Sequence, residues 1–251
     1  MRRHIQAALL LLTGSAVLHI SLLSQVYLRY VKESLRPFLI ASAVLLLVLG
    51  VVSAVRDGLP FAPRRETDAE ADDGHGHGHD GGPRVAWVLL LPVLALLLYA
   101  PPALGSYTAA RETDNAVAPV SEFEPLPNAD PAPLALSGFI ARVQQDRDRS
   151  LAGRTVLMTG FVTPAKDGTG TWYLTRLVVS CCAADSRSLR IRVHGRPAPP
   201  ADTWVTVTGT WHPGGGGELG TAAAAVALDA RTVERVPEPV DPYQDTAPPL
   251  P

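Results

Sequence analysis

Long uncharged apolar runs fill the first 105 residues, and the rest of the chain is more polar. A helix needs about 20 apolar residues to cross a bilayer, and three runs approach that length. We expect spans at about 5–28, 37–55 and 85–104, in a transmembrane domain covering residues 1–105. An alternative for the first run is a cleaved signal peptide, because Arg2 and Arg3 precede it. Apolar sequence resumes at once, which favours a span.

Basic residues near the span ends predict the orientation. One side of the membrane would carry Arg2, Arg3, Arg56, Arg64, Arg65 and Arg84, and the other Arg29, Lys32, Arg36 and Arg111. This excess places the N-terminus and the loop 56–84 in the cytoplasm, and the C-terminal domain outside. The formal net charge of −2 gives no basic footprint for nucleic acid.

Three low-complexity segments separate or end these regions. The loop 56–84 contains alternating histidines, which could capture zinc, nickel or copper or simply belong to a linker. Its candidate ligands are His75, His77, His79 and Asp80. Residues 106–134 are rich in Pro, Ala and acids and predict a tether. Residues 237–251 are a Pro-rich tail that we expect to lie outside any packed core.

The period of the apolar residues changes to two after Thr155. Five runs of this kind, separated by Gly- and Pro-rich turns, predict five short strands. In the third run, Leu189, Ile191 and Val193 would face inward. An apolar stripe after Ser137 predicts one short helix before the strands. We therefore expect a mainly-β domain at 135–236, an OB-like small barrel.

The only two cysteines, Cys181 and Cys182, are adjacent at the end of the second predicted strand. If Leu177 and Val179 face the barrel interior, Cys181 follows them and Cys182 points out with Arg176 and Ser180. Neighbours on a regular strand cannot hold one ion, so the strand must end or bulge here for joint chemistry. A disulfide between neighbours would be strained and easily reduced, which suits a redox switch. Packing of two small apolar side chains is the third reading.

A metal site gains support from oxygen and nitrogen ligands elsewhere in the domain. Asp185 follows the pair closely, and His194 and His212 lie at strand edges on the polar side. Thiolate, imidazole and carboxylate ligands together suit zinc or copper. The spacing matches no standard structural zinc pattern.

The motif R-x-x-x-S-C-C-x-A-D resembles that of the YcgQ-type family of bacterial membrane proteins. Here it comprises Arg176, Ser180, Cys181, Cys182, Ala184 and Asp185. GFV at 160–162, VTGTW at 207–211, PY at 242–243 and RYVKESLRP at 29–37 are also similar to the family. The resemblance implies a multi-pass protein of the bacterial cell membrane that is paired with a large polytopic permease. It implies no enzymatic activity.

These observations favour a non-enzymatic accessory subunit of a membrane permease whose outer domain binds a soft metal ion. The first alternative is a thiol/disulfide redox protein or sensor that uses Cys181 and Cys182. The second is a structural, membrane-tethered adaptor in which the cysteines only pack.

Overall fold

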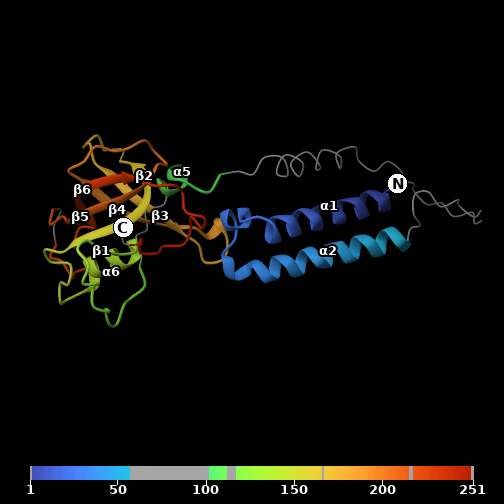
Figure 1. The fold of residues 1–251 in the computed structure, drawn as a ribbon, viewed down its shortest axis with the longest axis horizontal. Coiled ribbons are helices and arrows are strands. Elements are labelled where there is room, and N and C mark those ends of the chain that lie inside the picture. Colours follow the sequence, from blue (N-terminus) through green and yellow to red (C-terminus); the bar gives the residue numbers. More distant parts are fainter. Residues whose placement is uncertain (1, 57–101, 112–116, 166, 215–216, 250–251) are drawn as a thin grey trace, which may run out of the picture. The chain divides into compact units, whose positions relative to one another are not determined.

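The computed structural model describes residues 2–56, 102–111, 117–165, 167–214 and 217–249. The chain divides into two compact units. One contains the helices before Tyr27 and after Glu33, and the other contains Leu28–Lys32 with the chain from Ala103 onward. Figure 1 shows the long helices α1 and α2, which belong to the first unit, and the strands, which belong to the second. The short peptide 28–32 therefore belongs with the strands, although it lies between two helices in the sequence.

In its described part, the first unit has two long helices, α1 (Arg2–Leu22) and α2 (Arg36–Arg56), that pack through small residues. A Cβ atom added to Gly14 would lie 2.9 Å from Leu47 Cγ. One added to Gly50 would lie 2.8 Å from Leu11 Cγ. Both distances are shorter than van der Waals contact, so glycine lets the two backbones approach closely, as in membrane helix pairs.

One helix in the described part of the chain, Glu33–Arg56, is long and apolar enough to cross a membrane. A signal sequence near an N-terminus has the same length and composition. Gln6–Leu22 is apolar but shorter. Most of the third predicted span, 85–104, lies outside the described residues, so that span stays a prediction. The structure thus provides one helix of membrane length, and the three-span arrangement remains an expectation.

The second unit contains a mainly-β domain, as the sequence predicts. Its strands are β1 (Ala132–Pro133), β2 (Thr155–Pro164), β3 (Trp172–Val178), β4 (Arg187–His194), β5 (Trp204–Trp211) and β6 (Ala227–Arg235). The last five overlap the five predicted strands, although β3 ends at Val178 and the second predicted strand continued to the cysteines. β1 is too short to produce an alternating pattern, and the sequence analysis missed it.

The sheet closes on itself, because its last strand also pairs with β2. Its order is β1-β2-β3-β4-β6-β5, and β5 also pairs with β2. The pairs are antiparallel except β1 with β2 and β4 with β6. β2 pairs with β5 over Thr155–Phe161 and with β3 over Phe161–Pro164. One long strand therefore serves two neighbours, and it changes partner next to Gly160.

Apolar side chains from the strands form the main core, and α6 (Leu136–Gln145) packs into it. Phe139, Ile140 and Val143 of this helix are fully buried, which confirms the predicted stripe. Along β4, the buried and partly exposed side chains alternate as predicted, with Leu189, Ile191 and Val193 inside.

Segments on either side of the predicted barrel also contribute to the domain. The predicted linker contains α5 (Ser106–Ala109) as well as β1. The expectation that the Pro-rich tail lies outside any packed core is wrong, because Tyr243 is buried in an apolar cluster with Phe161 and Trp204. The Asp245 carboxylate accepts hydrogen bonds from the backbone N–H groups of Leu136 at 3.0 Å and Ser137 at 2.8 Å. The tail thus supplies the cap for the first turn of α6, which has no side-chain cap of its own.

We expect the substitution Gly160→Ala to lower the free energy of unfolding by about 1–3 kcal/mol, the usual cost of overpacking. The added methyl group would lie 2.6 Å from the Thr175 carbonyl oxygen, which belongs to the neighbouring backbone. Urea unfolding of the full chain in detergent, followed by tryptophan fluorescence, measures the change. Gly138→Ala in α6 is the control, because its methyl group meets only the flexible end of Leu134, at 3.3 Å. Equal stability of the Gly160→Ala variant would contradict the close approach.

Candidate functional site

The cysteine pair lies in the connection between β3 and β4, outside the ladder. Val178 at the end of β3 pairs with Arg187 at the start of β4, and the residues between them leave the sheet. They include a single 3₁₀ turn, η3 (Ala183–Asp185). The strand therefore ends before Cys181. Two neighbouring thiols can act on one ion only where the strand ends or bulges, so this requirement is met.

The side chains of β3 face the opposite way from the expectation. Leu177 belongs to a second apolar cluster with Phe161 and Trp204, whereas Val178 packs against the main core. The assumption that Leu177 and Val179 point into the barrel was therefore wrong. The reason is this second cluster, which buries apolar side chains on the other face of the sheet.

Arg176 does not share an outer face with the cysteines. Its side chain is only 3% exposed. Nε donates to the Thr159 carbonyl oxygen and Nη1 to that of Gln244, each at 2.9 Å. The guanidinium also lies 4.8 Å from the centroid of the Trp204 ring. Arg176 thus connects β2 to the C-terminal tail. This arginine of the sequence motif therefore holds these two segments in position.

The Asp185 carboxylate organises the loop that carries the cysteines. Oδ2 accepts a hydrogen bond from the Cys181 N–H at 2.8 Å. Oδ1 accepts from the N–H groups of Ser180 at 3.0 Å and Cys182 at 3.4 Å. Three consecutive backbone donors are thereby satisfied by one side chain, so the loop folds around Asp185. Hydrogen bonds from the Cys181 thiol and from the backbone lower the pKa of Asp185.

The two sulfur atoms lie close together and reach solvent. Cys181 Sγ and Cys182 Sγ are 3.7 Å apart, and both residues are free thiols. Cys181 is exposed and Cys182 is partly buried. The Cys182 sulfur also accepts a hydrogen bond from the backbone of Asp185. The pair is therefore accessible and held at a fixed separation without a covalent bond.

The Cys181 thiol is difficult to ionise. Its hydrogen bond to the Asp185 carboxylate, followed by that to Cys182, raises the pKa of Cys181 to about 11. A group with this pKa is ionised in about one molecule in ten thousand at neutral pH. Because the thiolate is the nucleophile in disulfide exchange, this environment slows redox chemistry.

The peptide between α1 and α2 holds the cysteine loop from the other side. Val31 forms an antiparallel bridge with Cys182. The Lys32 N–H donates to the Cys181 carbonyl oxygen at 3.1 Å, and the Ala183 N–H donates to that of Tyr30 at 2.7 Å. The sequence analysis used this peptide only for its resemblance to a family. No periodicity could have indicated a single bridge between residues so far apart in the chain.

Tyr243 fixes the same peptide through its hydroxyl group. Its OH donates to the Arg29 carbonyl oxygen at 3.0 Å and accepts from the Leu104 N–H at 2.9 Å. The ring is buried in the second apolar cluster. The tail, the start of the domain and the peptide 28–32 therefore meet at one side chain.

The two histidines predicted as ligands lie at the opposite end of β4. His194 is seven residues beyond Arg187, which corresponds to about 23 Å along a strand. Its ring stacks on that of His212, with centroids 4.2 Å apart. His212 Nδ1 lies 2.9 Å from Asp229 Oδ1. Burial, and then the neighbouring His212, lowers the pKa of His194.

The predicted five-residue ligand set is therefore divided into two groups, one at each end of β4. Among the described residues, no group of three or more His, Cys, Asp or Glu side chains is arranged to hold a metal ion. The loop residues His75, His77, His79 and Asp80 lie outside the described part of the chain.

We expect alkylation of Cys181 by iodoacetamide to be slow at pH 7 and to accelerate about tenfold per pH unit towards pH 11. Asp185→Asn removes the negative charge that favours the protonated thiol, so it should move this profile to lower pH. Mass spectrometry of the labelled peptide distinguishes the two sulfurs. An unchanged profile in the variant would show that Asp185 does not control the thiol.

Removal of the Tyr243 hydroxyl group should destabilise the domain. Tyr243→Phe leaves the Leu104 N–H and the Arg29 carbonyl without their partner, at a cost of about 1–3 kcal/mol. Thermal unfolding of the full chain, followed by tryptophan fluorescence, measures this loss. Tyr107→Phe is the matched control, because Tyr107 is 69% exposed. Equal losses in the two variants would contradict the role of the buried hydroxyl group.

Comparison with known proteins identifies one domain. Residues 138–244 match the family described as the DUF1980 C-terminal domain. The matched region begins inside α6, contains the cysteine loop and all strands from β2 to β6, and ends beside Tyr243. No curated protein and no solved structure matches the chain. The chain thus carries a DUF1980 C-terminal domain built on the sheet and the loop described above.

Proposed function

We propose that this protein is a non-enzymatic accessory subunit of a membrane permease, and that its β domain presents Cys181 and Cys182 to a soft metal ion. The observation that carries the proposal is the pair of free thiols, exposed Cys181 and partly buried Cys182, whose sulfurs lie 3.7 Å apart. Zinc binds thiolates at about 2.3 Å in tetrahedral geometry, which separates two sulfurs on one ion by about 3.8 Å. The pair therefore fits two positions on one tetrahedral ion with almost no movement.

The site would offer only two ligands, and this suits an accessory role. Asp185 is engaged with three backbone donors, so in this proposal it positions the loop and does not bind the ion. The remaining positions of a tetrahedral ion stay open to water or to ligands from a partner protein. An ion held in this way can be transferred. Zinc and monovalent copper are the preferred candidates, because both accept thiolate ligands.

The peptide between the two helices supports a multi-pass arrangement with the domain outside the cell. Leu28–Lys32 belongs to the same unit as Ala103 and the chain beyond it. If α2 crosses the membrane, the chain must cross a second time before Ala103 to return to the same side. The apolar run 85–104 is the segment of suitable composition. The distribution of basic residues then places the domain on the extracytoplasmic side.

Resemblance and topology support the remaining parts of the proposal. The DUF1980 C-terminal domain is consistent with the YcgQ-type family, which implies a bacterial membrane location and a polytopic permease as partner. The five-strand ring β2-β3-β4-β6-β5 agrees with an OB-type barrel. The exposure of Cys181 argues against the adaptor in which both cysteines merely pack. The raised pKa of Cys181 slows disulfide exchange at neutral pH, whereas a metal ion that binds the sulfur would displace the thiol proton.

Metal binding by the reduced full chain tests the proposal. In detergent, with alanine at His75, His77 and His79 to remove the loop histidines, we expect one zinc or monovalent copper ion per chain. X-ray absorption should report sulfur neighbours, at about 2.3 Å for zinc. Cys181→Ser and Cys182→Ser should each abolish tight binding, whereas Ser180→Ala and His194→Ala should retain it. Absence of binding, or binding that survives loss of both thiols, would refute the metal site.

A controlled oxidation of the same protein separates the redox alternative. That reading requires reversible loss of two hydrogens between Cys181 and Cys182, which intact mass spectrometry detects. Co-purification from native membranes tests the permease separately, because a polytopic partner should be retained even by the Cys181→Ser variant.

A further inference from the structure

Strand β6 has an open edge over its second half. β4 runs beside β6 only from Ala227 to Asp229. The chain then leaves the sheet at Gly195, which adopts a positive φ of 80°. Beyond Asp229, no described strand pairs with β6 on this side, although β5 continues to pair with the other side as far as Arg235. The closed sheet therefore has a gap between β4 and the second half of β6.

The phase of the β5–β6 ladder shows which backbone groups face this gap. The Val236 N–H donates to the Trp204 carbonyl oxygen at 3.0 Å, towards β5. Because hydrogen-bonding directions alternate along an antiparallel strand, Val233 and Arg235 direct their N–H and C=O groups the other way. Arg196 already uses the open edge at Arg231, whose carbonyl oxygen accepts from Nε at 2.9 Å and Nη2 at 2.6 Å. The backbone groups on this edge are thus able to form hydrogen bonds with a neighbouring group.

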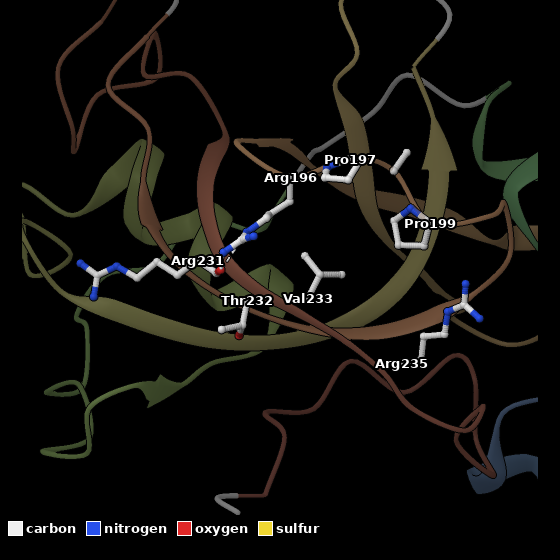
Figure 2. Close-up of a pocket in the computed structure, with 8 residues that line it drawn as sticks. Arg196, Pro197, Pro199, Arg231, Thr232, Val233 and Arg235 are labelled. Atoms are coloured by element: carbon white, nitrogen blue, oxygen red, sulfur yellow. Dashed lines mark hydrogen bonds between the residues drawn. The ribbon is translucent and has the colours of Figure 1, made fainter.

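A groove of about 510 Å³ follows this edge. Figure 2 shows its two sides, with Pro197 and Pro199 on one and Val233 on the other. Arg231 and Arg235 lie near its two ends, and their side chains point apart. Their Cα atoms are four residue steps apart along the strand, or about 13 Å. Because the two side chains also point apart, an extended chain suits both guanidinium groups better than a single small anion does.

The charge at the groove is uncompensated. Arg196, Arg231 and Arg235 take part in none of the ion pairs formed within the described part of the chain. Arginines on an open edge discourage pairing with neutral strands, which protects against aggregation. The same charges favour a strand whose carboxylates recur at the spacing of Arg231 and Arg235. The edge therefore favours an acidic strand and disfavours pairing with neutral strands.

We propose that the β6 edge, defined by Arg231 to Arg235 and the Pro197–Pro199 wall, docks an extended acidic segment of a partner protein. The segment adds to the sheet as a strand, with its backbone paired to Val233 and Arg235. Acidic side chains four residues apart pair with Arg231 and Arg235. This site goes beyond the proposed metal function and does not depend on the cysteines, which lie in a different part of the domain.

A labelled peptide and the full chain in nanodiscs test the proposal. The probe is a ten-residue peptide of alternating valine and threonine with two glutamates four residues apart. Fluorescence anisotropy should show saturable binding at low salt. The double variant with Arg231→Gln and Arg235→Gln should bind about tenfold more weakly, as expected for the loss of two exposed ion pairs. Arg187→Gln on β4 is the control and should change affinity no more than about twofold.

Backbone pairing requires a second readout, because ion pairing alone would also depend on the arginines. Hydrogen exchange should show new protection of the Val233 and Arg235 amides when the peptide binds. N-methylation of alternate peptide residues should abolish binding in one register and spare it in the other. Equal binding of a glutamine peptide, equal effects of both N-methylated registers, or binding without amide protection would each overturn the proposal. So would inorganic polyphosphate that binds as tightly as the peptide, which would indicate a simple anion site.

Discussion

The Asp185 carboxylate and the three N–H groups that it binds determine the form of the candidate site. A β-hairpin with a regular turn would place neighbouring cysteines on opposite faces of the sheet. By gathering the amides of Ser180, Cys181 and Cys182, the carboxylate bends this segment out of the ladder and brings the sulfurs to the same side. The acidic residue of the motif is therefore best understood as the organiser of the loop. The hydrogen bond that this carboxylate accepts from the Cys181 thiol also raises the pKa of that thiol.

The C-terminal tail is a structural part of the domain, and its polar groups act over long distances in the sequence. Asp245 caps α6, the Gln244 carbonyl oxygen binds the buried guanidinium of Arg176, and the Tyr243 hydroxyl group binds the peptide before α2. Each contact satisfies a backbone or guanidinium group that burial would otherwise leave unpaired. The cysteine loop is thus supported by segments from both ends of the chain.

Local periodicity was sufficient to predict the strands and the short helix, because alternation of apolar residues directly reflects burial on one face. The same reasoning failed for β3, where Leu177 and Val178 are both apolar and two separate cores compete for them. It also could not foresee that His194 and His212 would stack far from the cysteines, since strand register sets that separation. The tail contacts and the Val31 bridge are long-range events for which neighbouring residues carry no signal. The adjacent cysteines and Asp185 were recognisable because their side-chain chemistry is uncommon.

The bridge between Val31 and Cys182 has a consequence for biosynthesis. The ribosome makes Val31 early and Cys182 late, with 150 residues, including α2 and strands β1 to β3, between them. Contacts between such distant residues form slowly, because the loop that they close is long. Until Cys182 emerges, the peptide around Val31 has no strand to pair with. The thiol loop therefore cannot assemble until most of the chain has been made, and a chain truncated before Cys182 could not form the bridge.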